Sequence, residues 1–504
     1  MRTRTVSANK EKPVLPDGIV AIVKRECPTC ELVAPVLVEL SHRVSLTVYT
    51  QDDPAFPDGV DAVDDTSLEL SWHYGIDSVP TLLRVEDGVE TARLEGWQRE
   101  DWEAFTGQGG LGPELPAWRP GCGSMSVDPS RVHVLAARYG SSVLHSRRVE
   151  VAAAEDEIEA FYARGWTDGL PVVPPTEARV MAMLEGTTRG PREIVAVVPP
   201  DLVEIDVEKV AINAVMAGCR PEYLPVVLAA VEAACTDEFN VHGVLATTMP
   251  VGPVIVVNGP IRRAIGMNSG VNVFGQGNRA NATIGRAVQL VIRNVGGGRP
   301  GEVDRATHGN PGKLGFCFAE DEEGSPWGPL CADLPGSPVV ADGGAGEGGA
   351  AGSREGRSTV TLFAGEGPRC IVDQLSRDPD SLTQTYASCL RTLHHPKLAL
   401  IFDCMLAIGP EHSRVFRQAG WSKERLLGRL GELLTASGDE IVRGASGMAE
   451  GMPDHFAGSA IPKFRPGGLL VVHCGGGAGL FSEMIGGWAS GDIGSQPVVR
   501  EIRP

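Results

Sequence analysis

A buried strand, two close cysteines and a helix follow one another near the start of this 504-residue chain. The apolar run 18–23 has the length of a strand enclosed in a sheet, and residues 31–40 have the pattern of a helix. Between them lies the tetrapeptide Cys27-Pro28-Thr29-Cys30. Because a helix N-terminus offers free N–H groups and partial positive charge, it favours a thiolate on Cys27. The order of these elements predicts a redox site.

The two cysteines have different predicted roles. Cys27, at the helix start, is the nucleophile, and Cys30, one turn further on, attacks the mixed disulfide and releases the product. Two other interpretations of the pair are an inert couple of thiols and half of a zinc site. No second Cys-x-x-Cys is present to complete a four-cysteine zinc site, so we assign no metal site to it.

A second segment continues the pattern. Residues 79–85, Val-Pro-Thr-Leu-Leu-Arg-Val, read as a strand that is followed by a turn at 86–90. Together with the cysteine tetrapeptide, this segment resembles the thioredoxin family over residues 14–108. The resemblance implies a thioredoxin fold there, and a cis peptide bond before Pro80. In that family the proline loop packs beside the cysteines and presents backbone groups to an extended substrate.

The resemblance is altered at three places. Glu26 precedes the first cysteine where thioredoxins usually carry tryptophan, and Ala21 stands where they bury a proton-handling aspartate. The acidic stretch 51–68, which holds two prolines, lengthens the gap between the cysteines and Pro80. These differences indicate that the domain serves a dedicated partner and is not a general protein reductant.

The length, charge and cysteine content of the whole chain limit the classes of protein to which it can belong. Its length allows two to four domains, and its net charge of −19 argues against nucleic acid and anionic membrane surfaces as partners. No run of 18 apolar residues is present, so we expect no membrane span, and the polar, basic start of the chain lacks the apolar core of a secretory signal. Eleven cysteines, an odd number, fit reduced thiols, and we therefore expect a cytoplasmic protein.

The chain after residue 108 is predicted to contain a linker and a large second region. Residues 109–150 begin with a Pro/Gly-rich stretch and read as a linker or tether, in which Cys122 is either a thiol that shuttles between domains or an incidental exposed thiol. Residues 151–504 read as a layered α/β catalytic region, with a flexible Gly-rich segment at 334–357. Its pattern suggests two similar halves, with strands at 194–198, 244–248, 254–257, 397–405 and 468–473, and helices at 206–216, 221–235, 281–295 and 422–435.

The second region also resembles uncharacterised bacterial sequences, and no activity follows from that resemblance. The residues that carry it are at 165–171, 216–223, 278–286 and 409–412. A loop at 274–280, which overlaps the third of these segments, fits G-x-G-x-x-A ahead of a helix. Its predicted binding residues are Gly275, Gly277, Asn278 and Arg279. Such a loop can hold a dinucleotide, another anion or a substrate, and it can equally be a plain tight turn.

Further candidate residues are scattered over the second region. Cys474 ends the apolar strand 468–473 before a glycine turn, where a following helix would lower its pKa; otherwise it is a buried cysteine at a packed turn. Cys219 precedes Arg220, which could stabilise a thiolate or bind an acidic substrate. The weaker candidates are His308 in a polar loop, His412 and Asp168. Our hypothesis is that His308, Arg279 and Cys474 converge on one pocket.

We therefore predict a two-part, thiol-dependent oxidoreductase. A thioredoxin-like domain exchanges disulfides through Cys27, Cys30 and Pro80, and it serves a larger α/β catalytic domain that acts on a small-molecule or thiol substrate. One alternative is a cysteine-dependent lyase or transferase that cleaves a carbon–sulfur or carbon–metal bond and passes on sulfur or a thiophilic metal. Another is a thiol or metal carrier without enzymatic activity. The sequence indicates no cofactor other than such a metal. It leaves the oligomeric state open, and a homo-oligomer is one of the options.

Overall fold

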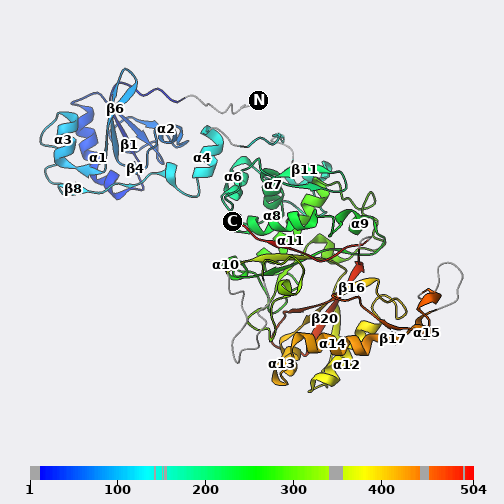
Figure 1. Ribbon diagram of the computed structural model, residues 1–504. Helices are drawn as coiled ribbons and strands as arrows, with labels where there is room; N and C mark the ends of the chain where they lie inside the picture. The colour runs from blue at the N-terminus through cyan, green and yellow to red at the C-terminus, as the bar shows by residue number, and fades with distance from the viewer. Residues whose placement is uncertain are drawn as a thin grey trace. The chain divides into compact units, whose positions relative to one another are not determined.

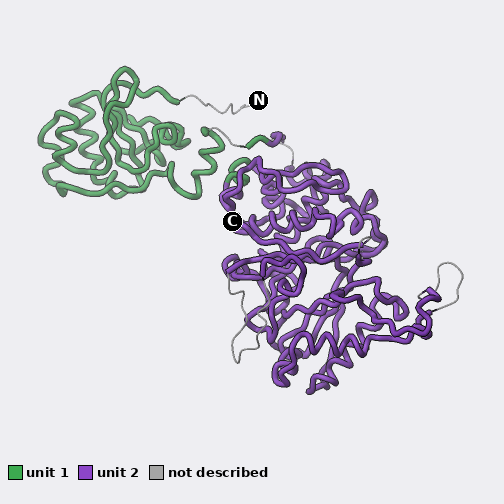
Figure 2. The backbone as a smooth tube through the Cα atoms, in the orientation of Figure 1, with its two compact units in different colours: residues 1–145, 177–181 green, residues 146–176, 182–504 purple. Residues whose placement is uncertain are grey.

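The protein is a mixed α/β structure that divides into two compact units. The computed structural model describes residues 12–140, 144–149, 151, 156–339, 356–442, 453–491 and 494–504. The first unit comprises residues 1–145 and 177–181, and the second comprises 146–176 and 182–504 (Figure 2).

The first unit is built on a five-stranded sheet with β1 (Gly18–Val23) at its centre. On one side β1 pairs in parallel with β2 (Leu46–Thr50), which in turn pairs in parallel with β3 (Ala62–Asp64). On the other side β1 pairs antiparallel with β5 (Thr81–Glu86), and β5 pairs antiparallel with β6 (Val89–Glu95). Five of the six residues of β1 are buried, as the apolar run predicts.

The helix predicted after the cysteines is α1 (Pro28–Ser41). Pro28 occupies its first turn, where a missing N–H costs no hydrogen bond. The buried face of α1 contributes Val33, Val36, Leu37 and Leu40 to the core of this unit. Because β1 is central and buried, this packing fixes the start of α1 near the carboxyl end of β1.

The chain beyond residue 108 differs from the predicted linker. The two-residue strand β8 (Trp118–Arg119) pairs with β7 (Trp97–Gln98), and β9 (Cys122–Gly123) pairs with β4 (Ser78–Val79). Further on, α4 (Val132–Tyr139) packs Leu135 and Tyr139 against Leu68. Backbone pairing and apolar contacts therefore make most of this segment part of the first unit, which extends to residue 145.

The second unit contains a sheet whose strand order is β13-β12-β14-β20-β16-β19. In its first half, β12 (Gly252–Asn258) pairs in parallel with β13 (Phe316–Ala319) and antiparallel with β14 (Thr359–Gly365). One further strand, β21 (Val498–Glu501), lies outside this order and pairs antiparallel with β14.

The second half of this sheet has the same arrangement. Here β16 (Phe402–Ile408) pairs in parallel with β19 (Leu469–His473) and antiparallel with β20 (Phe481–Ala489). In each half the first strand in the chain is central, the second is its parallel neighbour and the third its antiparallel neighbour. The halves meet where Gly365 of β14 pairs with Gly487 of β20.

Helices cover the two halves separately, as Figure 1 shows. The first half is covered by α7 (Val207–Ala217), α8 (Leu224–Ala234) and α11 (Arg279–Asn294). The second half packs against α12 (Pro379–Arg391), α13 (Pro410–Gln418) and α14 (Lys423–Leu434). A separate apolar core joins side chains from both halves of the sheet: Val254, Val256, Phe318, Met405, Ala407, Leu470 and Val472.

Most predicted elements of the second region are present, with two differences. Residues 244–248, predicted as a strand, lie largely in α9 (Val241–Ala246), whose N-terminus is capped by the Asn240 side chain. The strand predicted from 397 begins only at 402, because the ammonium of Lys463 binds three carbonyl groups of the turns before it. Of the predicted Gly-rich segment 334–357, residues 340–355 lie outside the described residues.

The remaining elements complete the two units. They are α2 (Glu69–His73), α3 (Arg99–Thr106), α5 (Glu157–Ala163), α6 (Glu177–Leu184), β10 (Ile194–Val198), β11 (Val203–Asp206), α10 (Ile261–Ala264), β15 (Arg369–Val372), β17 (Thr435–Ser437), α15 (Gly438–Ile441) and β18 (Ala460–Pro462). Among the described residues, no single helix is long and apolar enough to cross a membrane; α7 and the helical segment Pro221–Ala234 reach that length only together, bent by 120°.

Candidate redox site and a second cavity

Cys27 is the N-cap residue of α1, in an extended backbone conformation. The N–H of Cys30 donates a hydrogen bond to Cys27 Sγ at 3.3 Å. This satisfies one of the free N–H groups that every helix start leaves, and it brings positive partial charge to the sulfur. Both cysteine side chains are 0% exposed, so the predicted redox pair is enclosed.

The contacts of Cys27 favour its thiolate. The neighbouring thiol of Cys30 is the largest influence on Cys27; with the thiol of Cys122 and the N–H groups of Cys30 and Thr29, it outweighs burial and lowers the pKa of Cys27 to about 5. The pKa of Cys30 moves the other way and is strongly raised, chiefly by burial and then by its bond to Cys27. The pair therefore consists of a thiolate acceptor and a thiol donor.

Pro80 lies where the resemblance places it. The Val79–Pro80 peptide bond is cis, and the Val79 carbonyl oxygen lies 3.5 Å from Cys27 Sγ. Pro80 directly precedes β5, the antiparallel neighbour of β1. The sheet thus brings residue 79 next to residue 27 although 52 positions separate them in the sequence.

A third cysteine, Cys122, completes this site. In β9 it is paired with Val79, whose carbonyl oxygen lies 3.5 Å from Cys27 Sγ, and its side chain packs against the buried cluster that contains Cys27. Burial and the neighbouring Cys27 raise the pKa of Cys122, so it is the protonated partner. Unlike the other two cysteines, Cys122 is only half-buried. The sequence shows Cys122 only as a cysteine between glycines, and the pairing that positions it is long-range.

Residues 118–124, here named the strap, are bound to the first unit by polar contacts close to the cysteines. Thr29 Oγ1 donates to the Pro120 carbonyl at 2.8 Å, and Lys24 Nζ donates to the Gly123 carbonyl at 2.7 Å. The side chain of Gln51 donates to Ser124 Oγ at 2.7 Å. Gly121 lies so near the backbone of β4 that an added Cβ would be 2.2 Å from Ser78 Oγ. The strap therefore covers the pair closely.

The acidic stretch 51–68 also supports the site. Asp52 accepts hydrogen bonds from the backbone N–H groups of Arg25, at 2.7 Å, and Glu26, at 2.9 Å. These are the two residues immediately before Cys27. Asp52 therefore holds the loop that leads into Cys27, a role that composition alone did not indicate.

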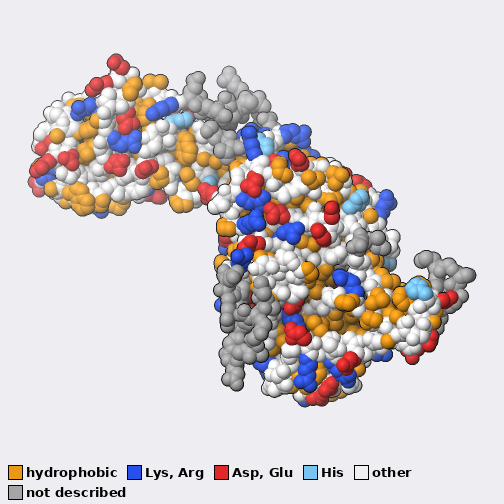
Figure 3. Space-filling view, viewed as in Figure 1, with side chains coloured by type: hydrophobic (Ala, Val, Ile, Leu, Met, Phe, Trp, Pro, Cys, Tyr) orange, Lys and Arg blue, Asp and Glu red, His pale blue; other side chains and the backbone are white. Residues whose placement is uncertain are grey.

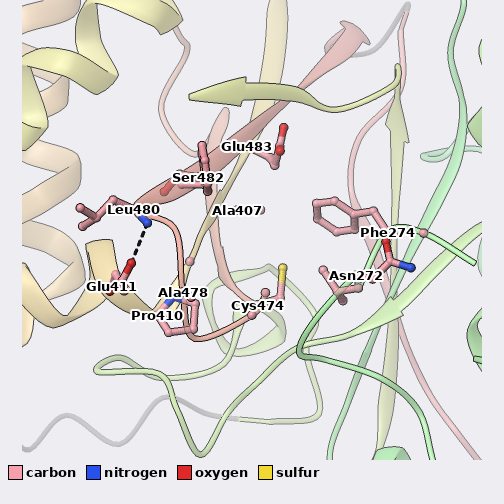
Figure 4. Close-up of a pocket in the computed structure, with 16 residues that line it drawn as sticks. Asn272, Phe274, Ala407, Pro410, Glu411, Cys474, Ala478, Leu480, Ser482 and Glu483 are labelled. Carbon is pink, nitrogen blue, oxygen red and sulfur yellow. Dashed lines mark hydrogen bonds between the residues drawn. The ribbon is translucent and has the colours of Figure 1, made fainter. Parts of the chain in front are cut away.

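The second unit has a cavity of about 280 Å³ at the carboxyl ends of β16 and β19, shown in Figure 4. Cys474 and the start of the glycine loop at Gly275 both line it, so two predicted site regions do meet. Arg279 and His308 do not line it, and the hypothesis that they converge there with Cys474 is wrong. The other polar lining groups come from Asn272, Glu411, Ser482 and Glu483.

Cys474 is not an activated thiol. Residues 475–480 form no helix after β19, so the expected helix N-terminus is missing. Burial raises the pKa of Cys474 well above its ordinary value, and the carboxyl groups of Glu320, Asp321 and Glu483 raise it further. The alternative interpretation, a buried cysteine at a packed glycine turn, fits this environment.

Glu320, which follows β13, is a buried acid that sequence reasoning missed. Its carboxyl group accepts hydrogen bonds from Asn258 Nδ2, at 2.7 Å, and from the N–H of Leu330, at 2.8 Å. Burial nevertheless raises its pKa to about 7. In the duplicated strand arrangement Glu320 follows β13 as Cys474 follows β19, and the Glu320 carboxyl group contributes to the raised pKa of Cys474.

The glycine loop at 274–280 is a capped turn. Asn278 is the N-cap of α11 and accepts a hydrogen bond from the N–H of Asn281 at 3.0 Å. Arg279 Nε donates to the Gly218 carbonyl at 2.9 Å and is thereby directed toward the chain before Cys219. Gly277 has a φ of +115°, which explains its glycine. The loop offers a cavity wall at Gly275 rather than a continuous anion cradle.

The remaining candidates lie in separate places. The thiol of Cys219 donates to the Thr283 carbonyl, and burial raises its pKa to about 12. His308 is exposed in its loop. Asp168 forms a two-point ion pair with Arg286, both contacts at 2.8 Å, and so holds its loop against α11. His412 Nδ1 lies 2.8 Å from Ser482 Oγ, below the cavity wall.

The structure and the comparisons leave the family open. No group of three or more His, Cys, Asp or Glu side chains within the described ranges is arranged to hold a metal ion. No protein-family model matches the chain, and a search of curated proteins finds no match either.

Proposed function

We propose that this protein is a thiol–disulfide oxidoreductase whose reacting centre is Cys27 with Cys30, in a thioredoxin-like first unit. The observation that carries the proposal is the environment of Cys27. Its sulfur accepts a hydrogen bond from the N–H of Cys30 at the start of α1, and this N–H and two neighbouring thiols together bring its pKa to about 5. A thiolate is the form of cysteine that attacks disulfides, and this one is populated at neutral pH.

The reaction uses both cysteines in turn. Cys27 attacks one sulfur of a substrate disulfide, the other sulfur leaves as a thiolate, and a mixed disulfide forms on Cys27. Cys30 then attacks Cys27 Sγ and releases the second substrate thiol, leaving a Cys27–Cys30 disulfide. Two electrons pass from the cysteine pair to the substrate, and a cellular thiol reductant restores the pair. Cys30 is correctly placed because its thiol already contacts the sulfur that it attacks.

The alternatives have less support from the site. Sulfur or metal transfer by the same cysteines requires a ligand set that accepts the cargo, and no arranged metal-holding group is found in the described parts of the chain. A reaction in the second unit that depends on an activated cysteine lacks a suitable thiol, since the pKa of every cysteine described there is raised: Cys219, Cys235, Cys317, Cys331, Cys370, Cys389, Cys404 and Cys474.

The setting of this reaction is part of the proposal. All eleven cysteines are free thiols, as in a reducing compartment such as the cytoplasm. Acidic and basic side chains are interspersed over the visible face of the molecule (Figure 3), a surface that suits a small thiol or disulfide better than a polyanion. The second unit then uses or regulates the electrons that the first unit handles.

The test is turnover of oxidised glutathione by the full chain in the presence of a thiol reductant. Cys27→Ser should abolish turnover, and Cys30→Ser should also stop it, because the Cys27–Cys30 disulfide cannot form. Cys389→Ser, which removes a half-buried thiol from α12, is the control and should retain wild-type turnover. Unchanged turnover in Cys27→Ser would contradict the proposal, and metal bound stoichiometrically through these cysteines would favour the carrier.

A further inference from the structure

The enclosure of Cys27 presents a problem that the strap resolves. Cys27 and Cys30 are both 0% exposed, so an external disulfide cannot reach either sulfur directly. The strap covers them, and the only thiol of the site that is half-buried belongs to the strap, at Cys122. A half-buried cysteine therefore packs beside the enclosed Cys27, opposite the residue whose carbonyl oxygen lies 3.5 Å from Cys27 Sγ.

We infer that Cys122 is the thiol through which the enclosed Cys27–Cys30 pair exchanges disulfides with external thiol compounds. The inference rests on the proposed function and changes its first step: Cys122, rather than Cys27, meets the external disulfide, and Cys27 then attacks the mixed disulfide on Cys122. The partner is a disulfide small enough, or exposed enough, to reach one sulfur in a strand at the surface.

The positions of the three sulfurs follow from separate structural elements. Cys27 and Cys30 lie one turn apart at the start of α1, and Cys122 is held opposite Val79, whose carbonyl oxygen is 3.5 Å from Cys27 Sγ. Gly121 allows the strap to approach β4 closely, and Thr29 binds the strap from α1. The strap is thus fixed from two sides in the position that places Cys122 against Cys27.

The exchange balances in three steps. The sulfur of Cys122 attacks the external disulfide, one external thiol leaves with the proton of Cys122, and a mixed disulfide forms on Cys122. The Cys27 thiolate then attacks Cys122 Sγ, the second external sulfur leaves and takes a proton from water, and a Cys27–Cys122 disulfide forms. Finally Cys30 attacks Cys27 Sγ, and the departing Cys122 sulfur receives the proton of Cys30.

The net result is a Cys27–Cys30 disulfide and two external thiols, with Cys122 restored. The last step needs no separate base, because the proton that Cys30 loses is taken by the sulfur that leaves. This matters here because Ala21 provides no carboxylate behind the pair. The raised pKa of Cys122 also makes it the sulfur that accepts that proton readily.

The test treats reduced, full-length protein with oxidised glutathione and maps the disulfides by mass spectrometry. In Cys27→Ser we expect a lasting glutathione adduct on Cys122. In Cys30→Ser we expect both glutathione molecules to be released and a Cys27–Cys122 disulfide to remain. In Cys122→Ser the Cys27–Cys30 disulfide should form about tenfold more slowly or less, because the accessible relay sulfur is gone. Cys389→Ser should match wild type.

The outcomes separate the inference from the proposed function. If wild type itself forms no Cys27–Cys30 disulfide, the proposed function fails. If wild type forms it and Cys122→Ser does so at the same rate, the inference is overturned while the proposed function stands. A glutathione adduct found on Cys27 alone in Cys30→Ser, with Cys122 still reduced, likewise overturns the inference. Retention of the low thiolate pKa in Cys122→Ser, read from ultraviolet absorbance, shows that the variant is folded.

Discussion

Cys27 and Cys474 occupy similar places in two different sheets, and their thiols have opposite properties. Each follows a buried strand, β1 or β19, and each is fully or almost fully buried. The pKa of Cys27 is lowered to about 5, whereas that of Cys474 is raised well above its ordinary value. A helix begins at Cys27, and only a glycine turn follows Cys474. Burial at a strand end therefore does not activate a cysteine; hydrogen-bond donors aimed at the sulfur do.

The charges around the two sulfurs increase the difference. Cys27 is surrounded by thiols and N–H groups that donate to it. Cys474 has the carboxyl groups of Glu320, Asp321 and Glu483 nearby, which oppose a second negative charge. The four predictions that follow test this difference in order of expected size.

The largest expected difference is in disulfide turnover. Cys27→Ser should reduce turnover of oxidised glutathione by about a thousandfold or more, because without Cys27 the Cys27–Cys30 disulfide that completes the exchange cannot form. Cys474→Ala should leave turnover within about twofold of wild type, since a protonated buried thiol takes no part in the exchange. Rates under identical reductant concentrations decide the matter, and an equal loss in both variants would break the comparison.

The next difference is in thiolate titration. Ultraviolet absorbance of reduced protein should show one cysteine ionising with a midpoint near pH 5, far below the ordinary cysteine value of 9.0. Because the folded pKa is lowered, the stability that the Cys27 thiolate contributes is present above the ordinary pKa and is lost as the pH falls through about 5. Cys27→Ser should remove this transition, and Cys474→Ala should keep it; a midpoint near 9 in wild type would refute the assigned environment.

Glu320 should make the second unit sensitive to pH in the opposite direction. Its pKa is raised from 4.5 to about 7, so the folded state holds the proton more tightly than the unfolded state. The stabilisation is complete below about pH 4.5 and is lost as the pH rises through about 7, by about 3 kcal/mol in free energy of unfolding. Chemical unfolding followed across this range should show the slope in wild type and a flatter profile in Glu320→Gln. A slope of the same size in that variant would assign it to other groups.

The smallest expected difference concerns access to Cys27. Gly121→Ala would make an added methyl group clash with the Ser78 side chain and come within 3.1 Å of the Val79 carbonyl oxygen, and we expect the strap to shift away from β4. Alkylation of Cys27 by iodoacetamide should then become several-fold faster. Gly123→Ala is the matched control, because an added Cβ there meets nothing within 4 Å. Equal alkylation rates in the two variants would show that the strap does not limit access.

Local sequence patterns predicted the parts of the fold that local patterns determine. We find the predicted strand at 18–23, the helix after Cys27 and the helix at 206–216. Each is marked by its own apolar residues, and each of the two helices also has its capping residue next to it in the sequence. The helix α9 was missed since its apolar residues fit a buried strand equally well and only the Asn240 cap distinguishes the two.

The site was predictable only in part for a related reason. Cys27 and Cys30 could be found because four consecutive residues and two flanking elements define them. Cys122 could not be placed, since its position depends on a two-residue ladder with Val79 that no periodicity reveals. The raised pKa of Cys474 likewise depends on burial and on Glu320, which is 154 positions earlier in the chain; the N–H of Asp321 donates to the His473 carbonyl at 2.8 Å and brings the two segments together.

The hydrogen bonds of Gln51 make it possible to measure how often the strap opens. This buried side chain donates to Ser71 Oγ and Ser124 Oγ and accepts from the backbone N–H of Met125 at 3.0 Å. One amide thus joins the acidic stretch, α2 and the end of the strap. Exchange of the Met125 amide hydrogen with deuterated solvent requires that bond to open, so its rate measures how often the segment next to Cys122 detaches. A single amide can therefore time the opening of the redox site in the unmodified protein.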